Sequence, residues 1–385
     1  MFSKVIKVYF KQSSRLCSTK SNIKNLLENS ATFVDIKPQH SEQEWATLPY
    51  PEGSKPRVQG DYDPSSKINP EDTSVILFPG QGTQFVGMAK DLLKYPMARD
   101  LFELANHTLG FDLLKICLEG PQKELDKTEN CQLAVVVTSL AAIERLKEER
   151  PNAIDKCVAT AGFSIGEITS LIFSGAIPFE KGLKLVQVRG HAMQMACDEI
   201  ESGMATVFYG PDSRLGYACK RAKEWCVERG IEDPECTIAN YLYPHCKVVA
   251  GNLEALNFLE KNSKEFKLKR IKRLPVSGAF HTKLMEPALE PFRKALRKIN
   301  IEDPIISVYS NVDGKKYRNA EHIAKQLPKQ IVKPVKWEQT LHVMYERGEG
   351  THFPRTFECG PGTSLKSILK QVNAKAWDNC ISIKA

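Results

Sequence analysis

The chain has 385 residues, of which 42% are hydrophobic and 26% are charged. This length is sufficient for two packed units, and the composition excludes a wholly disordered chain or a collagen-like fibre. The longest apolar run, residues 133–143, contains Thr138 and Ser139 and is shorter than the roughly 18 residues that a membrane span needs. We therefore predict no membrane span.

The formal net charge of +8 is concentrated at the N-terminus. Residues 1–30 contain six basic side chains and one acidic side chain, which leaves a net charge of +3 for residues 31–385. A basic surface over the whole molecule is therefore not supported, and we predict no nucleic-acid partner.

The first 30 residues are basic and rich in serine, and Glu28 is their one acid. This pattern is typical of a mitochondrial transit peptide, which predicts a protein of the mitochondrial matrix; the alternative is a disordered basic tail. Residues 31–72 are rich in proline and have little periodicity. They are expected to form an extended linker or arm.

The globular part begins with a buried strand at 74–78 that Pro79 and Gly80 end. A helix at 131–149, a strand at 156–161 and a helix at 180–200 follow. This alternation of strands and helices predicts an α/β fold with a parallel sheet covered by helices.

Residues 204–274 have a different order, in which strands and helices follow the pattern β-α-β-β-α-β. This is the ferredoxin-like pattern, and it lies between two α/β stretches. We therefore predict a small subdomain at 204–274, inserted into a large domain made of 73–203 and 275–385. Later elements of the large domain are expected at 284–299 (helix), 305–310 (strand), 320–347 (helices), 355–359 (strand) and after Gly362 (helix).

Eleven cysteines and eight histidines are scattered along the chain. No C-x-x-C pair occurs, and the histidines lack the spacing of metal ligands. Several cysteines lie in apolar segments, which favours buried free thiols in a reducing compartment. We predict no metal site.

The sequence AGFSIGE at 161–167 is a G-x-S-x-G motif between a predicted strand and a predicted helix. A tight strand–turn–helix presents the serine in a strained conformation, and glycines at 162 and 166 avoid clashes. The helix N-terminus would direct backbone N–H groups toward an oxyanion beside Ser164. Ser164 is therefore a candidate nucleophile, although the motif alone is weak.

A nucleophilic serine needs a base, and His281 is the strongest candidate. It ends the segment LPVSGAFH, where a predicted strand runs into a loop before the helix at 284. No acidic residue near Ser164 or His281 is an evident third member of a triad. The loop FPGQGTQ at 78–84, expected between the first strand and a helix, lacks the lysine of a phosphate-binding loop but could supply an oxyanion donor.

Six segments together resemble the malonyl-CoA:acyl carrier protein transacylases over residues 74–373. They are FPGQGTQFVGM, GFSIGE, LVQVRGHAMQ, PVSGAFHTKLMEPA, QIVKPVKWEQT and ECGPG. The segment NYLYP and the basic leader resemble most the mitochondrial form of animals. The resemblance implies a hydrolase-like α/β core with a ferredoxin-like insertion. It also implies transfer of malonyl from malonyl-CoA to the phosphopantetheine thiol of acyl carrier protein, for type II fatty acid synthesis, without a bound cofactor.

The resemblance also implies a role for individual residues. Ser164 would be the nucleophile and His281 its base. The backbone N–H groups of Gln81 and Ile165 would form the oxyanion hole, and Arg189 would bind the malonyl carboxylate. The remaining matches are Gln330, whose backbone carbonyl would orient the histidine, Asn240, which would line the site, and Phe280, which would crowd an α-methyl group.

Two positions depart from the family pattern. Phe163 precedes the serine where many relatives have histidine, and residues 242–245 read Leu-Tyr-Pro-His where relatives often have Asn-Ser-Pro-Gly.

Residues 261–273 carry seven basic side chains and one acid. Lys269, Arg270 and Lys272 are candidates for docking an acidic carrier protein or the phosphates of CoA. An equally weighted alternative is an edge strand that its lysines protect from aggregation.

Two other functions compete with acyl transfer. A serine hydrolase or thioesterase would use the same dyad with water as the acceptor. A non-catalytic subunit that binds carrier protein would keep the fold but would not need the serine, the histidine and the arginine together.

Overall fold

The computed structural model describes residues 69–347 and 351–385, so the predicted leader and almost all of the predicted arm lie outside the described residues. A five-stranded sheet, with all neighbours parallel, forms the centre of the large domain in the order β10-β9-β1-β2-β7. Its strands are β1 (Ser74–Phe78), β2 (Cys157–Gly162), β7 (Ser307–Tyr309), β9 (Arg355–Gly360) and β10 (Cys380–Lys384).

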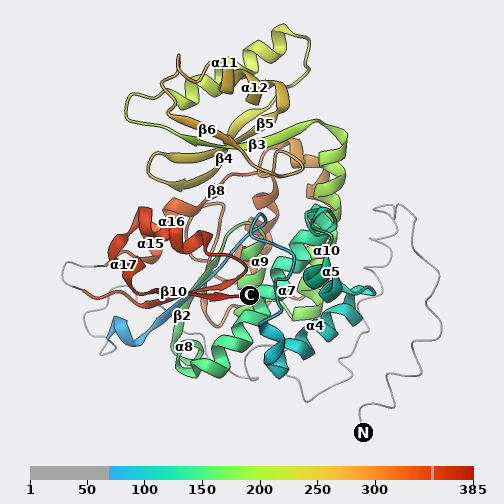
Figure 1. Cartoon of the computed structure of the whole chain (residues 1–385), viewed down its shortest axis with the longest axis vertical. Coiled ribbons are helices and arrows are strands. Elements are labelled where there is room, and N and C mark those ends of the chain that lie inside the picture. The colour runs from blue at the N-terminus through green and yellow to red at the C-terminus, as the bar shows by residue number, and fades with distance from the viewer. Residues whose placement is uncertain (1–68, 348–350) are drawn as a thin grey trace.

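Helices cover both faces of this sheet, as a parallel sheet requires (Figure 1). One layer contains α4 (Pro96–Leu109), α7 (Thr128–Glu149), α9 (Ile165–Phe173) and α10 (Phe179–Glu199), and the other contains α15 (Trp337–Met344), α16 (Ser364–Val372) and α17 (Ala374–Asp378). Alternate residues of β1 serve the two cores: Ile76 and Phe78 pack into the first, and Val75 and Leu77 into the second.

Helix α7 is buried along most of its length, which explains its nearly continuous apolar sequence. The connecting elements of the large domain are mostly short. They are η3 (Pro70–Asp72), η4 (Leu92–Lys94), α5 (Leu113–Glu119), α6 (Gln122–Leu125), α8 (Pro151–Asp155), η5 (Lys283–Ala288), α13 (Leu289–Leu296), α14 (Ala320–Gln326) and η6 (Leu327–Ile331).

A second sheet lies above the first in Figure 1, with α11 and α12 on its outer face. Its strand order is β6-β3-β5-β4-β8, and its elements are β3 (Ser202–Phe208), α11 (Leu215–Glu228), β4 (Cys236–Tyr243), β5 (Cys246–Asn252), α12 (Leu253–Lys261), β6 (Arg270–Arg273) and β8 (Val335–Lys336). The β-α-β-β-α-β order is confirmed, and so is the α/β fold class. The sequence did not indicate β8, which comes from the C-terminal part of the chain and pairs parallel with β4.

The loop position of His281 is confirmed, although the strand before it, β6, already ends at Arg273. One local expectation was wrong. No helix opens directly after β1; the chain makes turns until η4. The sequence also did not indicate β10, which pairs with β9 at the edge of the large sheet.

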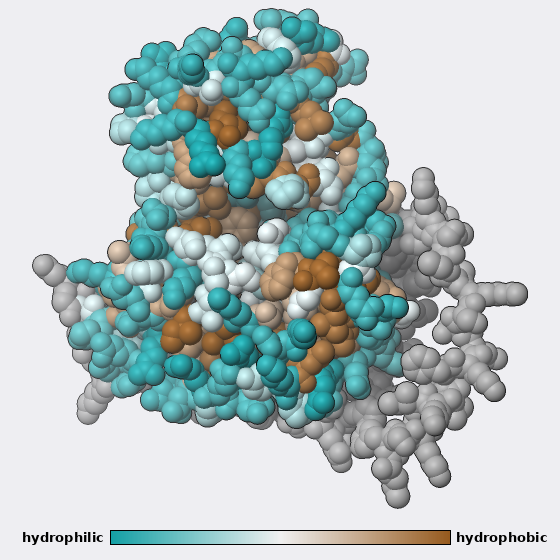
Figure 2. Space-filling view, in the orientation of Figure 1, coloured by the Kyte–Doolittle hydropathy of each residue, from teal (hydrophilic) through white to brown (hydrophobic). Residues whose placement is uncertain are grey.

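The two central strands of the large sheet, β1 and β2, end side by side beneath the second sheet. Figure 2 shows a hollow on this face of the molecule between the parts formed by the two sheets. In open α/β sheets the carboxyl ends of the strands are the usual place for ligands. The loops that follow β1 and β2 are therefore the first place to look for a site.

Candidate active site

Ser164 lies in the sharp turn between β2 and α9, with φ +54° and ψ −110°. The turn depends on two glycines. A Cβ on Gly162 would lie 1.8 Å from the backbone of Gly166, and a Cβ on Gly166 would lie 2.4 Å from the carbonyl oxygen of Phe78. Only glycine fits at both positions, so the sequence G-x-S-x-G forms a strained elbow that exposes the serine at the end of the strand.

The serine hydroxyl lies 2.8 Å from Nε2 of His281, and Nδ1 of the same ring lies 2.7 Å from the backbone carbonyl oxygen of Gln330. A carbonyl oxygen only accepts, so the hydrogen of the neutral ring is on Nδ1. Nε2 is then free to accept the proton of the Ser164 hydroxyl. The structure thus brings together residues 117 positions apart in the sequence.

His281 is neutral in this environment. Burial, reinforced by the nearby charge of Arg189, lowers its pKa to about 3, although the hydrogen bond to Gln330 opposes the shift. An imidazole that is uncharged at neutral pH can act as a general base.

Arg189 on α10 is 1% exposed and points at the serine. Its guanidinium donates to the side-chain oxygens of Gln132 (2.7 Å) and Gln330 (2.8 Å) and to Ser164 Oγ (3.2 Å). Nε of Arg189 is buried without a hydrogen-bond partner. Burial lowers its pKa to about 10, against the effect of Glu167, so the group stays charged at neutral pH. A buried cation held by neutral amide oxygens is a site for an anion.

The two predicted oxyanion donors follow segments of the chain that are in contact. A Cβ on Gly80 would lie 2.6 Å from the carbonyl oxygen of Phe163, so the loop after β1 lies against the elbow. Gln81 follows in that loop, and its side chain accepts from Gln132 at 3.5 Å. Ile165 is the first residue of α9, where backbone N–H groups lack helical partners.

Asn240 and Phe280 are both buried. Asn240 lies on β4, paired in register with Val335 of β8, and its side-chain oxygen is buried without a hydrogen-bond partner. Phe280 precedes His281 and packs into the core of the large domain. Phe163, in place of the common histidine, packs edge-on against the ring of Trp337 at 5.5 Å.

Lys269, Arg270 and Lys272 do not join this site. They are exposed at or beside β6, which is the edge strand of the second sheet.

Three buried side chains around the dyad were missed in the sequence. Glu167, Asn311 and Gln132 make hydrogen bonds to the dyad, to Arg189 or to their neighbours. Glu167 and Gln132 each interrupt an apolar helix on a buried face, and this was the available signal.

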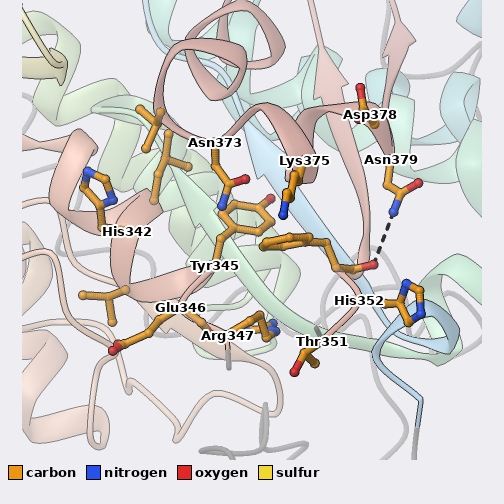
Figure 3. Close-up of a pocket in the computed structure, with 14 residues that line it drawn as sticks. His342, Tyr345, Glu346, Arg347, Thr351, His352, Asn373, Lys375, Asp378 and Asn379 are labelled. Atoms are coloured by element: carbon orange, nitrogen blue, oxygen red, sulfur yellow. Dashed lines mark hydrogen bonds between the residues drawn. The ribbon is translucent and has the colours of Figure 1, made fainter. Parts of the chain in front are cut away.

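A separate cavity of about 870 Å³ lies near α15 and α17. Figure 3 shows Arg347 and Lys375 on its wall, with the ring of Tyr345 nearby and a hydrogen bond of 3.4 Å from Asn379 to the Phe353 carbonyl. No residue of the dyad or of the arginine pocket lines it.

Within residues 69–347 and 351–385, no cluster of three histidine, cysteine or acidic side chains could hold a metal ion. The ten cysteines of this part are free and buried, as predicted. None of the helices in the same ranges has the length and apolar character needed to cross a membrane.

Comparison with known proteins identifies the family of the chain. The acyl transferase domain family matches residues 75–353. The chain is 64% identical to a probable mitochondrial malonyl-CoA-acyl carrier protein transacylase of Drosophila melanogaster, covering 83% of this chain and 84% of the relative. It is 52% identical to the human mitochondrial malonyl-CoA-acyl carrier protein transacylase, covering 80% and 79%. A malonyl CoA-acyl carrier protein transacylase of Coxiella burnetii has a similar structure, with a TM-score of 0.73, 29% identity and coverage of 82% and 95%.

Proposed function

The chain belongs to the mitochondrial malonyl-CoA-acyl carrier protein transacylases of the acyl transferase family, and we propose that Ser164 and His281 carry out the reaction through a malonyl-serine ester. The enzyme transfers malonyl from malonyl-CoA to acyl carrier protein for fatty acid synthesis. The observation that supports the proposed dyad best is the 2.8 Å contact between Ser164 Oγ and an imidazole nitrogen whose partner nitrogen faces a carbonyl oxygen.

In the first half-reaction, Ser164 Oγ attacks the thioester carbon while its proton passes to Nε2 of His281. The N–H groups of Gln81 and Ile165 stabilise the oxyanion. The C–S bond then breaks, and the imidazolium returns the proton to the departing CoA sulfur. In the second half-reaction the thiol of the carrier's phosphopantetheine gives its proton to His281 and attacks the ester carbon. The C–O bond then breaks, the imidazolium returns the proton to Ser164 Oγ, and the malonyl group leaves on the carrier's sulfur.

Arg189 selects the malonyl group in this scheme. Its fork-shaped guanidinium can pair with the free carboxylate by two hydrogen bonds, whereas an acetyl group would leave it without an anionic partner. Asn240, whose side-chain oxygen has no hydrogen-bond partner among the described residues, would line the site of the bound acyl group, and the ring of Phe280 would crowd an α-methyl substituent.

The dyad is tested by intact-protein mass spectrometry of residues 31–385 mixed briefly with malonyl-CoA. We expect a malonyl adduct on the wild type, its discharge by carrier protein, and no adduct on Ser164→Ala. Conversely, an equal adduct on Ser164→Ala would place the nucleophile elsewhere.

The same experiment separates the competing functions. In the absence of carrier protein a transferase keeps its malonyl-serine ester, whereas a hydrolase releases malonate rapidly. If neither adduct nor malonate forms, the chain is a non-catalytic binding subunit.

We further propose that Lys269, Arg270 and Lys272 dock the acidic carrier protein. The register of the second sheet supports the two strand residues: Lys272 is opposite Thr206 and Arg270 is opposite Phe208 on β3, and the row of Lys272 continues through Val248 to Asn240. Paired residues point to the same face of a sheet, so Lys272 shares the face that carries Asn240. Three strand spacings put them about 14 Å apart, which is within reach of an extended pantetheine arm.

The remaining proposals concern the whole chain. We propose that residues 1–30 are a transit peptide that directs the enzyme to the matrix and that residues 31–72 form a linker or arm. We also propose that residues 73–203 and 275–385 make up the large domain and that residues 204–274 make up the small subdomain. Exchange of one thioester for another needs only a nucleophile, a base and oxyanion donors. We therefore propose no bound cofactor; the phosphopantetheine belongs to the carrier.

A further inference from the structure

Glu167 lies three residues after the nucleophile, on the first turn of α9, and is completely buried. Its carboxylate accepts three hydrogen bonds. Oε1 accepts from the backbone N–H of Asn311 (3.1 Å) and from the hydroxyl of Tyr317 (2.6 Å), and Oε2 accepts from the side-chain amide of Gln330 (2.5 Å). All three partners are donors, so the arrangement suits the ionised carboxylate.

Asn311 holds the elbow itself. Its side-chain oxygen accepts from the backbone N–H of Ser164 at 2.7 Å, and its amide donates to the carbonyl oxygen of Gly162 at 2.7 Å. One side chain therefore fixes the backbone on both sides of residue 163, where the chain turns into the strained conformation of Ser164.

Gln330 holds the other reacting group. Its side-chain amide donates to the carbonyl oxygen of Ser164 (2.7 Å) as well as to Glu167, its side-chain oxygen accepts from Arg189, and its backbone carbonyl accepts from His281. The position of the imidazole is thus tied to the same residue that contacts the nucleophile's backbone.

These contacts form a closed ring. It runs from the N–H of Ser164 through Asn311, Glu167 and Gln330 back to the carbonyl of Ser164. Glu167 is the member that joins the Asn311 side to the Gln330 side. Among residues 69–347 and 351–385 no carboxylate makes a hydrogen bond to the imidazole, whose Nδ1 bonds a carbonyl oxygen.

We propose that Glu167, in its ionised form, is a positioning residue that holds Ser164 and His281 at reacting distance through Asn311 and Gln330. This inference rests on the proposed dyad. In the proposed reaction Glu167 does not touch the substrate. Its role is comparable to that of a triad acid, but it acts through an amide side chain and a backbone carbonyl rather than on the imidazole.

Protonation of Glu167 should weaken the ring, because a proton on Oε2 would face the amide donor of Gln330, and a proton on Oε1 would compete with the N–H of Asn311. Burial raises the pKa of Glu167 to about 7, against the effects of Tyr317, Gln330, Asn311 and the charge of Arg189. The other titratable groups that face it stay in one form near neutrality: burial and Glu167 hold the pKa of the Tyr317 hydroxyl well above its usual value, and that of Arg189 is about 10. His281, with a pKa of about 3, stays neutral.

The direction of the pH dependence follows from the raised pKa of Glu167. The ionised, ordered form predominates above pH 7, and the rate of Ser164 malonylation should fall as the pH drops through about 7. Protonation of His281 would produce such a fall only several units lower. A loss of rate near neutrality therefore reports on Glu167 rather than on the base.

The experiment measures the rate of malonyl adduct formation on Ser164 from pH 5.5 to 9, at a series of malonyl-CoA concentrations, in wild type, Glu167→Gln and Tyr317→Phe. For Glu167→Gln we expect a maximal rate about 100-fold lower, because a misplacement of about 1 Å has an effect of that size. The half-saturating concentration should change much less, and the fall near pH 7 should be absent. Tyr317→Phe removes one donor to the carboxylate and should move the fall to higher pH.

The matched control is Glu358→Gln. Glu358 is also fully buried and accepts from two backbone N–H groups, of Leu365 and Lys366, but its partners belong to α16 and β10 and not to the dyad. It should keep the wild-type rate and pH profile, and melting temperatures of all variants exclude unfolding as the cause.

Each outcome decides between the proposals. Wild type without an adduct on Ser164 overturns the proposed dyad. An adduct on wild type, combined with a Glu167→Gln variant that retains the fall near pH 7 or equals Glu358→Gln in rate, overturns the positioning role. A pH dependence of the malonylation rate in Tyr317→Phe that equals the wild-type dependence also overturns the positioning role.

Discussion

At the scale of single residues, the buried guanidinium of Arg189 gives the most specific indication of what the site binds. It is charged and 1% exposed, it is held by amide oxygens, and its Nε has no hydrogen-bond partner within the part of the chain that the structure describes. A buried charge is costly unless it is paired, and Glu167 acts on Arg189 through its charge without a hydrogen bond between them. In the proposed mechanism a malonyl carboxylate pairs with the guanidinium directly, so we expect the acyl selectivity to depend on burial as much as on hydrogen bonding.

Arg189→Ala should therefore change selectivity. Loss of the partner of a buried charge costs about 3–5 kcal/mol, so the rate of malonyl transfer from malonyl-CoA should fall by hundreds- to thousands-fold. Acetyl transfer should change little or rise, because no buried cation remains unpaired. The measurement is the rate of adduct formation on Ser164 with each thioester.

Lys181→Ala is the control for the loss of a cation on the same helix. Lys181 lies eight positions before Arg189, or about 12 Å along α10. Unchanged preference for malonyl in Arg189→Ala would refute the assignment.

A site residue can be predicted from the sequence when the residues that hold it in place are its near neighbours in the chain. Ser164 is recognisable because its glycines are adjacent in the chain, and the segment around His281 carries a motif. Glu167 sits inside the same motif, yet its partners Asn311 and Gln330 lie 144 and 163 residues away. No local pattern contains those contacts, so its place in the ring required the fold.

At the scale of elements, the length of a helix or strand determines whether its sequence periodicity predicts it. The strand β1 and the helix α10 are long enough to show their patterns, and both were expected. The strand β8 has two residues and exists because β4 is beside it. It begins four residues after η6 ends, so the pairing also anchors the segment that carries Gln330.

The edge strand β6 is the element whose function depends most on charge. Glutamate at both Lys269 and Lys272 should slow the transfer from malonyl-serine to carrier protein by about tenfold or more, because charge complementarity speeds the encounter of oppositely charged proteins by 10- to 1,000-fold. The difference should shrink as salt is added. The measurement is discharge of the preformed malonyl enzyme by carrier protein at low and high ionic strength.

Lys90→Glu with Arg99→Glu is the matched control. It changes the net charge by the same amount, and both side chains are exposed on the large domain. Arg99 lies on α4, at the far end of the molecule from β6 (Figure 1). If the two double variants discharge equally fast, the lysines of β6 protect an edge strand and do not dock the carrier.

At the scale of the whole molecule, the two sheets contribute different parts of the proposed site. The large parallel sheet and its covering helices carry the elbow and Arg189. The second sheet carries Asn240 and the basic edge strand. His281 and Gln330 come from the segments that return the chain to the large domain and toward β8. Figure 2 shows a hollow between the two parts, and the proposed mechanism requires the acyl group, its thioester and the carrier's arm to meet there.

The proposed N-terminal transit peptide belongs to the same scale, because the compartment sets which carrier protein and which malonyl-CoA pool the enzyme meets. Residues 1–30 have six basic side chains and one acid, while the rest of the chain is close to neutral. A basic, serine-rich segment of this kind is imported along the negative-inside membrane potential. Residues 1–40 fused to a fluorescent reporter should therefore direct it to mitochondria, with cleavage after about 17 to 30 residues. A variant with all six basic residues changed to glutamine should leave the reporter in the cytosol, and a wild-type fusion that stays there would rule out the transit peptide.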